Sequence, residues 1–68
     1  MREREMPVYL GQRYIGRFVS VDWHGGNEPW SIEALDDDGH IVKMEAETFA
    51  VEKGPVLRVT SGRCCEGP

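Results

Sequence analysis

The segment from Trp30 to Glu45 is the feature that most restricts what this chain can fold into. Two runs in which apolar and polar residues alternate, 30–35 and 40–45, flank the sequence Asp36-Asp37-Asp38-Gly39. Alternation with a period of two is typical of a half-buried β-strand. An Asp-Gly pair supplies the positive φ that a tight hairpin turn needs. The segment therefore predicts a β-hairpin.

Three further segments are expected to be extended. Residues 6–10 are a short apolar stretch, residues 14–23 are rich in the β-branched and aromatic residues that strands prefer, and residues 56–60 alternate. Apolar residues occupy both parities of 14–23, which indicates a twist or a bulge near Gly16. Residues 46–52 fit a strand or a single helical turn, and the sequence leaves that choice open.

These elements predict an all-β domain of four or five short antiparallel strands. A chain of 68 residues buries only about 60% of the surface that it exposes when unfolded, so its core must be thin. Isolated hairpins are not stable in water, and we expect the sheet to curl into a small barrel of the SH3-like or OB-like kind. An open antiparallel sheet with one short helix is the alternative. The folded domain is expected to span residues 6–60, with flexible tails at 1–5 and 61–68.

Charge is unevenly distributed along the chain. Residues 21–52 hold nine carboxylates and one lysine, a formal charge of −8, whereas the segments before and after them each carry +2. An acidic surface attracts basic partners and repels phosphate backbones. The net charge of −4 therefore disfavours nucleic acid as the partner and favours a protein.

Cys64 and Cys65 are adjacent and lie outside the apolar part of the chain. Neighbouring cysteines rarely bridge each other, because a disulfide between them strains the intervening peptide, so both are expected to be free thiols. The spaced cysteines of a secreted mini-protein are absent. No apolar run is long enough to span a membrane, and the charged N-terminus does not resemble a signal peptide. We expect a cytoplasmic protein without a membrane segment.

Several motifs contain some of the residues that a metal site or a catalytic site needs, but not the full set. A zinc site needs four ligands, usually from spaced cysteine pairs, and the acidic run 36–39 lacks the ligand spacing of a calcium loop. Asp22 and His24 share one strand face, but a hydrolase also needs an activated nucleophile and an oxyanion site. The nearby hydroxyls, Ser20 and Ser31, belong to no recognisable motif. We predict no catalytic residue, no metal and no cofactor.

Aromatic and arginine side chains are further candidates for binding. Tyr14 and Phe18 are expected in the core, whereas Trp23 and Trp30 flank a Gly-rich loop, so at least one of them should be partly exposed. An arginine face would form if the first and last strands of a barrel pair. Beside exposed aromatic rings, such a face would suit a single strand of nucleic acid. The candidate binding residues are therefore Trp23, Trp30, Asp36, Asp37, Asp38, Arg13, Arg17 and Arg58.

The function predicted from these patterns is that of a small, non-catalytic interaction or regulatory module that binds a protein partner through its acidic central surface. Two alternatives stay open. One is a small barrel that binds single-stranded nucleic acid through Arg13, Arg17, Arg58 and exposed aromatic residues. The other is a homo-oligomeric structural unit in which copies pair through edge strands.

Overall fold

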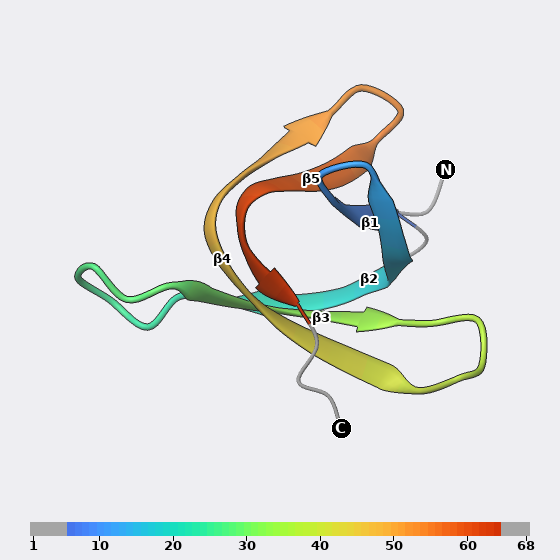
Figure 1. Cartoon of the computed structure of the whole chain (residues 1–68), viewed down its shortest axis with the longest axis horizontal. Coiled ribbons are helices and arrows are strands. Elements are labelled where there is room, and N and C mark those ends of the chain that lie inside the picture. Colours follow the sequence, from blue (N-terminus) through green and yellow to red (C-terminus); the bar gives the residue numbers. More distant parts are fainter. Residues whose placement is uncertain (1–5, 65–68) are drawn as a thin grey trace.

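A computed structural model of the chain describes residues 6–64. Its five strands are β1 (Pro7–Leu10), β2 (Arg13–Asp22), β3 (Trp30–Leu35), β4 (Ile41–Glu52) and β5 (Val56–Cys64). They form one closed barrel in the order β1-β2-β3-β4-β5, and these residues contain no helix (Figure 1). The predicted all-β fold, a small curled sheet or barrel, is confirmed.

The barrel closes through a parallel pair of strands. Each strand runs antiparallel to the next one along the chain. Five strands in this up-and-down order leave the first and the last pointing the same way, so β1 and β5 can pair only in the parallel sense. They do so, with Val8 opposite Leu57 and Leu10 opposite Val59. The predicted antiparallel pairing therefore holds for the four pairs of consecutive strands and not for this closing seam.

A thin apolar core fills the barrel. In β3, β4 and β5 the buried residues alternate with residues that face outward, as the pattern of the sequence predicts. No polar or charged side chain among residues 6–64 is buried. The buried core residues are Val8, Ile15, Ile32, Ala34, Met44, Ala46, Leu57 and Val59.

Bulges explain why both parities of β2 are apolar. Gly16 lies opposite Val8 and Tyr14 lies opposite Tyr9, so Ile15 is an extra residue and the predicted irregularity near Gly16 is confirmed. A second irregularity lies between Phe18 and Ser20. Phe18 packs against the core as expected, but the expectation for Tyr14 is wrong. Its ring is 42% exposed, because the bulge directs it to the outer face.

The second half of β4 is a strand, so the predicted alternative of a helical turn over residues 46–52 is wrong. Its pairing with β5 shifts on both sides of Thr48. Such bulges bend a strand and increase its twist without ending the ladder. The bend lets β4 leave β3 and follow β5 around the barrel.

The folded part of the chain also continues past residue 60, where the domain was expected to end. Residues 61–64 belong to β5 and pair with residues 44–48 of β4. Cys64 is disulfide-bonded, so the expectation of a free thiol there is wrong. The remaining residues of the two predicted tails, 1–5 and 65–68, lie outside the described residues.

A close backbone approach accounts for the glycine at position 62. A Cβ atom built there would lie 2.2 Å from the carbonyl oxygen of Glu45 and 2.9 Å from the Cα atom of Ala46. Both atoms belong to the backbone of the bent part of β4, so neither can rotate away. Only glycine lets β5 pass this close to β4.

We expect Gly62→Ala to lower the free energy of unfolding by about 1–3 kcal/mol, the usual cost of overpacking. Lys43→Ala, at an exposed position of β4, is the matched control and should change it by less than about 0.5 kcal/mol. Urea unfolding followed by circular dichroism measures both values. If the two variants are equally stable, the backbones of β4 and β5 are further apart at residue 62 than the structure places them.

Candidate functional site

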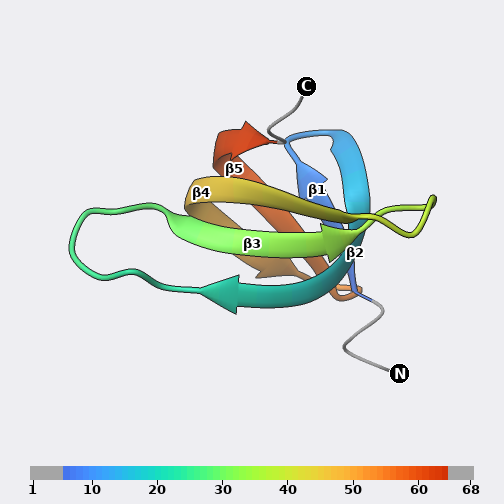
Figure 2. The ribbon, with the colours of Figure 1, turned by 90° about the horizontal axis from the view of Figure 1, so that it is seen from below.

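The structure places two groups of candidate residues at opposite ends of β3. Trp30 begins this strand, and the acidic turn 36–38 follows its end. The loop over residues 23–29 projects from one side of the barrel, and the turn between β3 and β4 projects from the other (Figures 1 and 2). A strand of six residues separates the two by roughly 17 Å. The predicted acidic and aromatic residues therefore do not form one compact site.

The acidic turn is organised by its own hydrogen bonds. The Asp36 carboxylate accepts hydrogen bonds from the backbone N–H groups of Asp38 and His40, each at 2.9 Å, and the N–H of Gly39 donates to the Asp36 carbonyl oxygen. The bond from His40 is the largest cause that lowers the pKa of the Asp36 carboxyl below 3.8. Ligand atoms of Asp36, Asp38 and His40 lie within 4.8 Å of one another, and these turn contacts account for that grouping without an ion.

The pKa of Asp36 predicts how this turn responds to acid. Because its folded-state value is lowered, the ionised carboxylate stabilises the turn above pH 3.8, and this contribution is lost as the pH falls through the lowered pKa. In an NMR titration, the amide signals of Asp38 and His40 should move together with a midpoint below 3.8. Asp36→Asn should abolish the transition, and a midpoint at or above 3.8 would contradict these hydrogen bonds.

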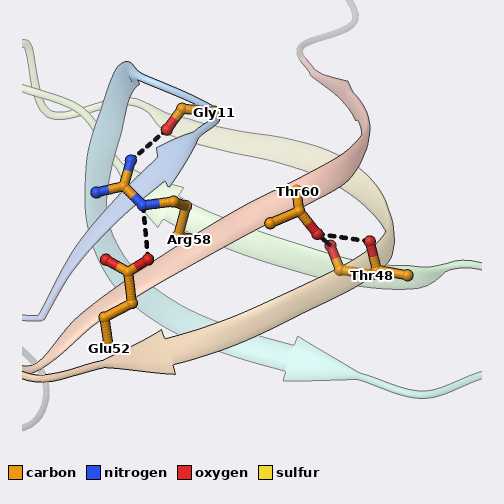
Figure 3. A network of polar contacts seen from close by, with 5 residues as sticks. All are labelled: Gly11, Thr48, Glu52, Arg58 and Thr60. Carbon is orange, nitrogen blue, oxygen red and sulfur yellow. Dashed lines mark hydrogen bonds and ion pairs between the residues drawn. The ribbon is translucent and has the colours of Figure 1, made fainter.

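Arg58 takes part in closing the barrel. Its side chain lies on β5, donates to the carbonyl oxygen of Gly11, which follows β1, and forms an ion pair with Glu52 of β4 at 2.9 Å (Figure 3). The guanidinium carbon also lies 5.0 Å from the centre of the Tyr9 ring on β1. One cation therefore joins three consecutive parts of the barrel wall across the seam.

The predicted arginine face is only partly assembled. Tyr9 lies between Tyr14 on β2 and Arg58 on β5 in the strand registers, and the two tyrosine rings meet edge to face at 5.5 Å. Arg13 and Arg17 are exposed on β2. Arg58 already interacts with Glu52, Gly11 and Tyr9, so it is not available in the way that a phosphate-binding residue would be.

We expect Arg58→Met to reduce the free energy of unfolding by about 1–2 kcal/mol, since it removes a cation–π contact and a hydrogen bond to a carbonyl. Glu52→Gln should cost less than about 1 kcal/mol, because an exposed ion pair is weak. Thermal unfolding measures both. A larger loss from Glu52→Gln than from Arg58→Met would show that the contacts of Arg58 to Gly11 and Tyr9 do not hold the seam.

Three aromatic rings form a row of successive contacts around Trp30, at the start of β3. Phe49 of β4 and Trp30 of β3 pack partly against the core and meet edge to face at 5.4 Å. Trp23, in the segment after β2, also packs against Trp30, with ring centres 6.0 Å apart and planes inclined by 30°. The row runs from the core to the surface, where Trp23 is 61% exposed. The expected partial exposure is thus found at Trp23.

Two open hollows flank this aromatic row. The tryptophan hollow, of about 320 Å³, is lined by Trp23, Trp30, Glu28, Pro29 and Glu47, with Gly26 and Asn27 of the loop. The glutamate hollow, of about 310 Å³, shares Pro29 and Glu47 with it and is completed by Glu45, Ser61, Gly62 and Arg63. Because the two share Pro29 and Glu47, they lie side by side along the loop, β4 and β5, and are together called the depression.

The depression is acidic. Glu28, Glu45 and Glu47 face it together with one cation, Arg63, which leaves a formal charge of −2. Within residues 6–64 the one ion pair joins Arg58 to Glu52, so none of these carboxylates forms an ion pair there. Glu47 accepts a hydrogen bond from the Ser61 hydroxyl at 3.2 Å, which fixes the carboxylate at the edge of both hollows.

A histidine and a serine also meet at the base of the loop. The His24 Nε2 atom lies 2.8 Å from the Ser31 hydroxyl, and Asp22 lies opposite Ser31 in the register of β2 and β3. In the described residues no hydrogen bond joins Asp22 to His24, and the His24–Ser31 pair is exposed. The arrangement therefore lacks the carboxylate that would orient the imidazole of a catalytic triad.

Comparisons with known proteins add no relative. No protein-family model, curated protein or solved structure matches this chain. No membrane-spanning helix occurs among residues 6–64.

The acidic neighbours of the two tryptophans were not among the residues predicted from the sequence. Glu28 and Glu47 are separated by 19 positions, and they line one hollow because β3, which begins directly after the loop, pairs with β4 so that Trp30 lies opposite Ala46. Glu28 and Pro29 lie beside Trp30 in the sequence, which is the one local signal that could have indicated the loop side of the site. No feature of the sequence around Glu47 indicates that it lines the site.

Proposed function

We propose that this protein is a non-catalytic interaction module, regulatory and cytoplasmic, that holds a basic segment of a protein partner in the depression formed by the two hollows. The observation that carries the proposal is the position of the exposed Trp23 ring beside carboxylates that have no ion-pair partner in the described residues. Exposed aromatic rings, tryptophan above all, are enriched at protein-binding surfaces.

Charge supports a basic partner. The depression has a formal charge of −2, and its three carboxylates belong to the segment 21–52, whose formal charge is −8. Fields of this kind raise the rate at which oppositely charged proteins meet and exclude partners of like charge. The turn at Asp36–Asp38 adds to the field at long range, but it lies at the other end of β3 and does not line the depression.

The strand order supports an SH3-like description of the barrel. An OB-fold is a Greek-key barrel, whereas the strands of this chain are joined in simple sequence order. Single-stranded nucleic acid fits less well as a ligand, because Arg58 is held by Glu52 and Gly11 and lies against the Tyr9 ring.

The proposal predicts binding of a short peptide of arginine, lysine, glycine and serine, and no binding of the same peptide with glutamine in place of each cation. Both tryptophans of the chain line the tryptophan hollow, so intrinsic fluorescence reports on it directly. Affinity should fall as salt is added, since the carboxylates are exposed to screening.

A charge-matched pair of variants locates the site. The double variant Glu28→Gln/Glu47→Gln should weaken binding about fivefold, as expected from the loss of two exposed ion pairs. Asp37→Asn/Asp38→Asn removes the same charge at the opposite end of β3 and should change affinity less than twofold. If both variants weaken binding equally, or if the basic peptide does not bind, the proposed site is wrong.

A further inference from the structure

The geometry of the two tryptophans restricts what can enter the tryptophan hollow. Their ring centres lie 6.0 Å apart and their planes are inclined by 30°, so the two indoles are neighbours with similar orientation. Trp23 lines the hollow and is 61% exposed, so its indole is accessible to a ligand. The hollow therefore offers the flat surface of one indole ring, which suits a planar cation.

The carboxylates of the hollow restrict the ligand further. Glu28 and Glu47 line the hollow together with Trp23, and ionised carboxylates only accept hydrogen bonds. A ligand that covers the indole must therefore carry N–H donors at its edge. At about 320 Å³, the hollow is at the lower end of the usual range for binding pockets, which is enough for one long side chain.

We propose that the tryptophan hollow is an arginine subsite, in which the guanidinium of one arginine of the partner stacks on Trp23 and donates to Glu28 and Glu47. This inference rests on the proposed function and names the side chain that anchors the partner. Arginine meets both requirements, because its guanidinium is planar, stacks on aromatic faces and presents several donors in one plane.

Lysine meets these requirements less well. Its ammonium is a compact and strongly hydrated charge that cannot lie flat on a ring. A methylated lysine is recognised by a cage of aromatic rings, whereas this hollow offers one open ring. The subsite therefore distinguishes arginine from lysine by shape and donor number at equal charge.

Two peptides that differ at one position test the subsite. Each is a glycine–serine pentapeptide with blocked ends and a single central cation, arginine in one and lysine in the other. Binding is followed by the backbone amide NMR signals of Glu28 and Glu47. We expect the arginine peptide to bind about two- to fivefold more tightly, the range of an exposed cation–π contact.

Variants of Trp23 test whether a preference for the arginine peptide depends on the indole ring. Trp23→Leu should make the two peptides bind equally, and Trp23→Phe, which keeps an aromatic face, should retain part of the preference. If Trp23→Leu does not fold, Trp23→Phe is compared with the native protein instead. A preference for arginine that this smaller ring leaves unchanged would overturn the stacking.

The outcomes separate this inference from the proposed function. If both peptides bind the native protein equally, the arginine subsite is wrong and the basic-segment proposal stands. If neither peptide binds and the longer basic peptide also fails, both proposals are wrong. An arginine preference that survives Trp23→Leu would overturn the role of Trp23.

Discussion

Parallel pairing between β1 and β5 is the constraint on which the rest of this structure depends. Five strands joined only by turns cannot close with every pair antiparallel, because the first and last strands point the same way. A chain of this size cannot bury enough surface in an open sheet. Closure encloses the eight core residues, and Arg58 reaches across the seam to hold it (Figure 3).

Closure also positions the candidate site. Since β5 is fixed against β1 at one end, its other end passes close to the bend of β4, where Gly62 lies against the backbone of Glu45 and Ala46. That contact brings Ser61 beside Glu47. The loop after β2 leads directly into Trp30, which packs against the core and against the Phe49 ring. The acidic depression is thus a consequence of how the barrel is completed.

The sequence was informative where the deciding interactions are local. The hairpin around Asp36 and Gly39 is predictable because its turn residues, hydrogen bonds and alternating strands lie within a few positions of one another. The path of β4 beyond Ala46 is not, because its bend is set by Gly62 on the neighbouring strand. For the same reason residues 61–64 looked like a tail, since their ladder partners are more than ten positions away.

The residues of the candidate site also differ in whether local sequence or distant contacts determine their position. Trp23 and Trp30 could be selected because both flank an evident loop, whereas Glu47 reaches them only through the three-dimensional path of β4. Composition indicated an acidic central segment but not the division of its carboxylates between the two ends of β3. Arg58 looked like a binding residue because an exposed arginine on a strand has the same local signature whether it contacts a ligand or closes a barrel.

Backbone nuclear Overhauser contacts across the seam test the closed barrel most directly. Closure predicts contacts between the amide and α protons of residues 8–10 and 57–59 in the staggered pattern of a parallel ladder, with Tyr9 facing Arg58. Absence of these contacts, or α-proton pairs typical of antiparallel strands, would contradict the closed barrel and, with it, the position assigned to the acidic depression.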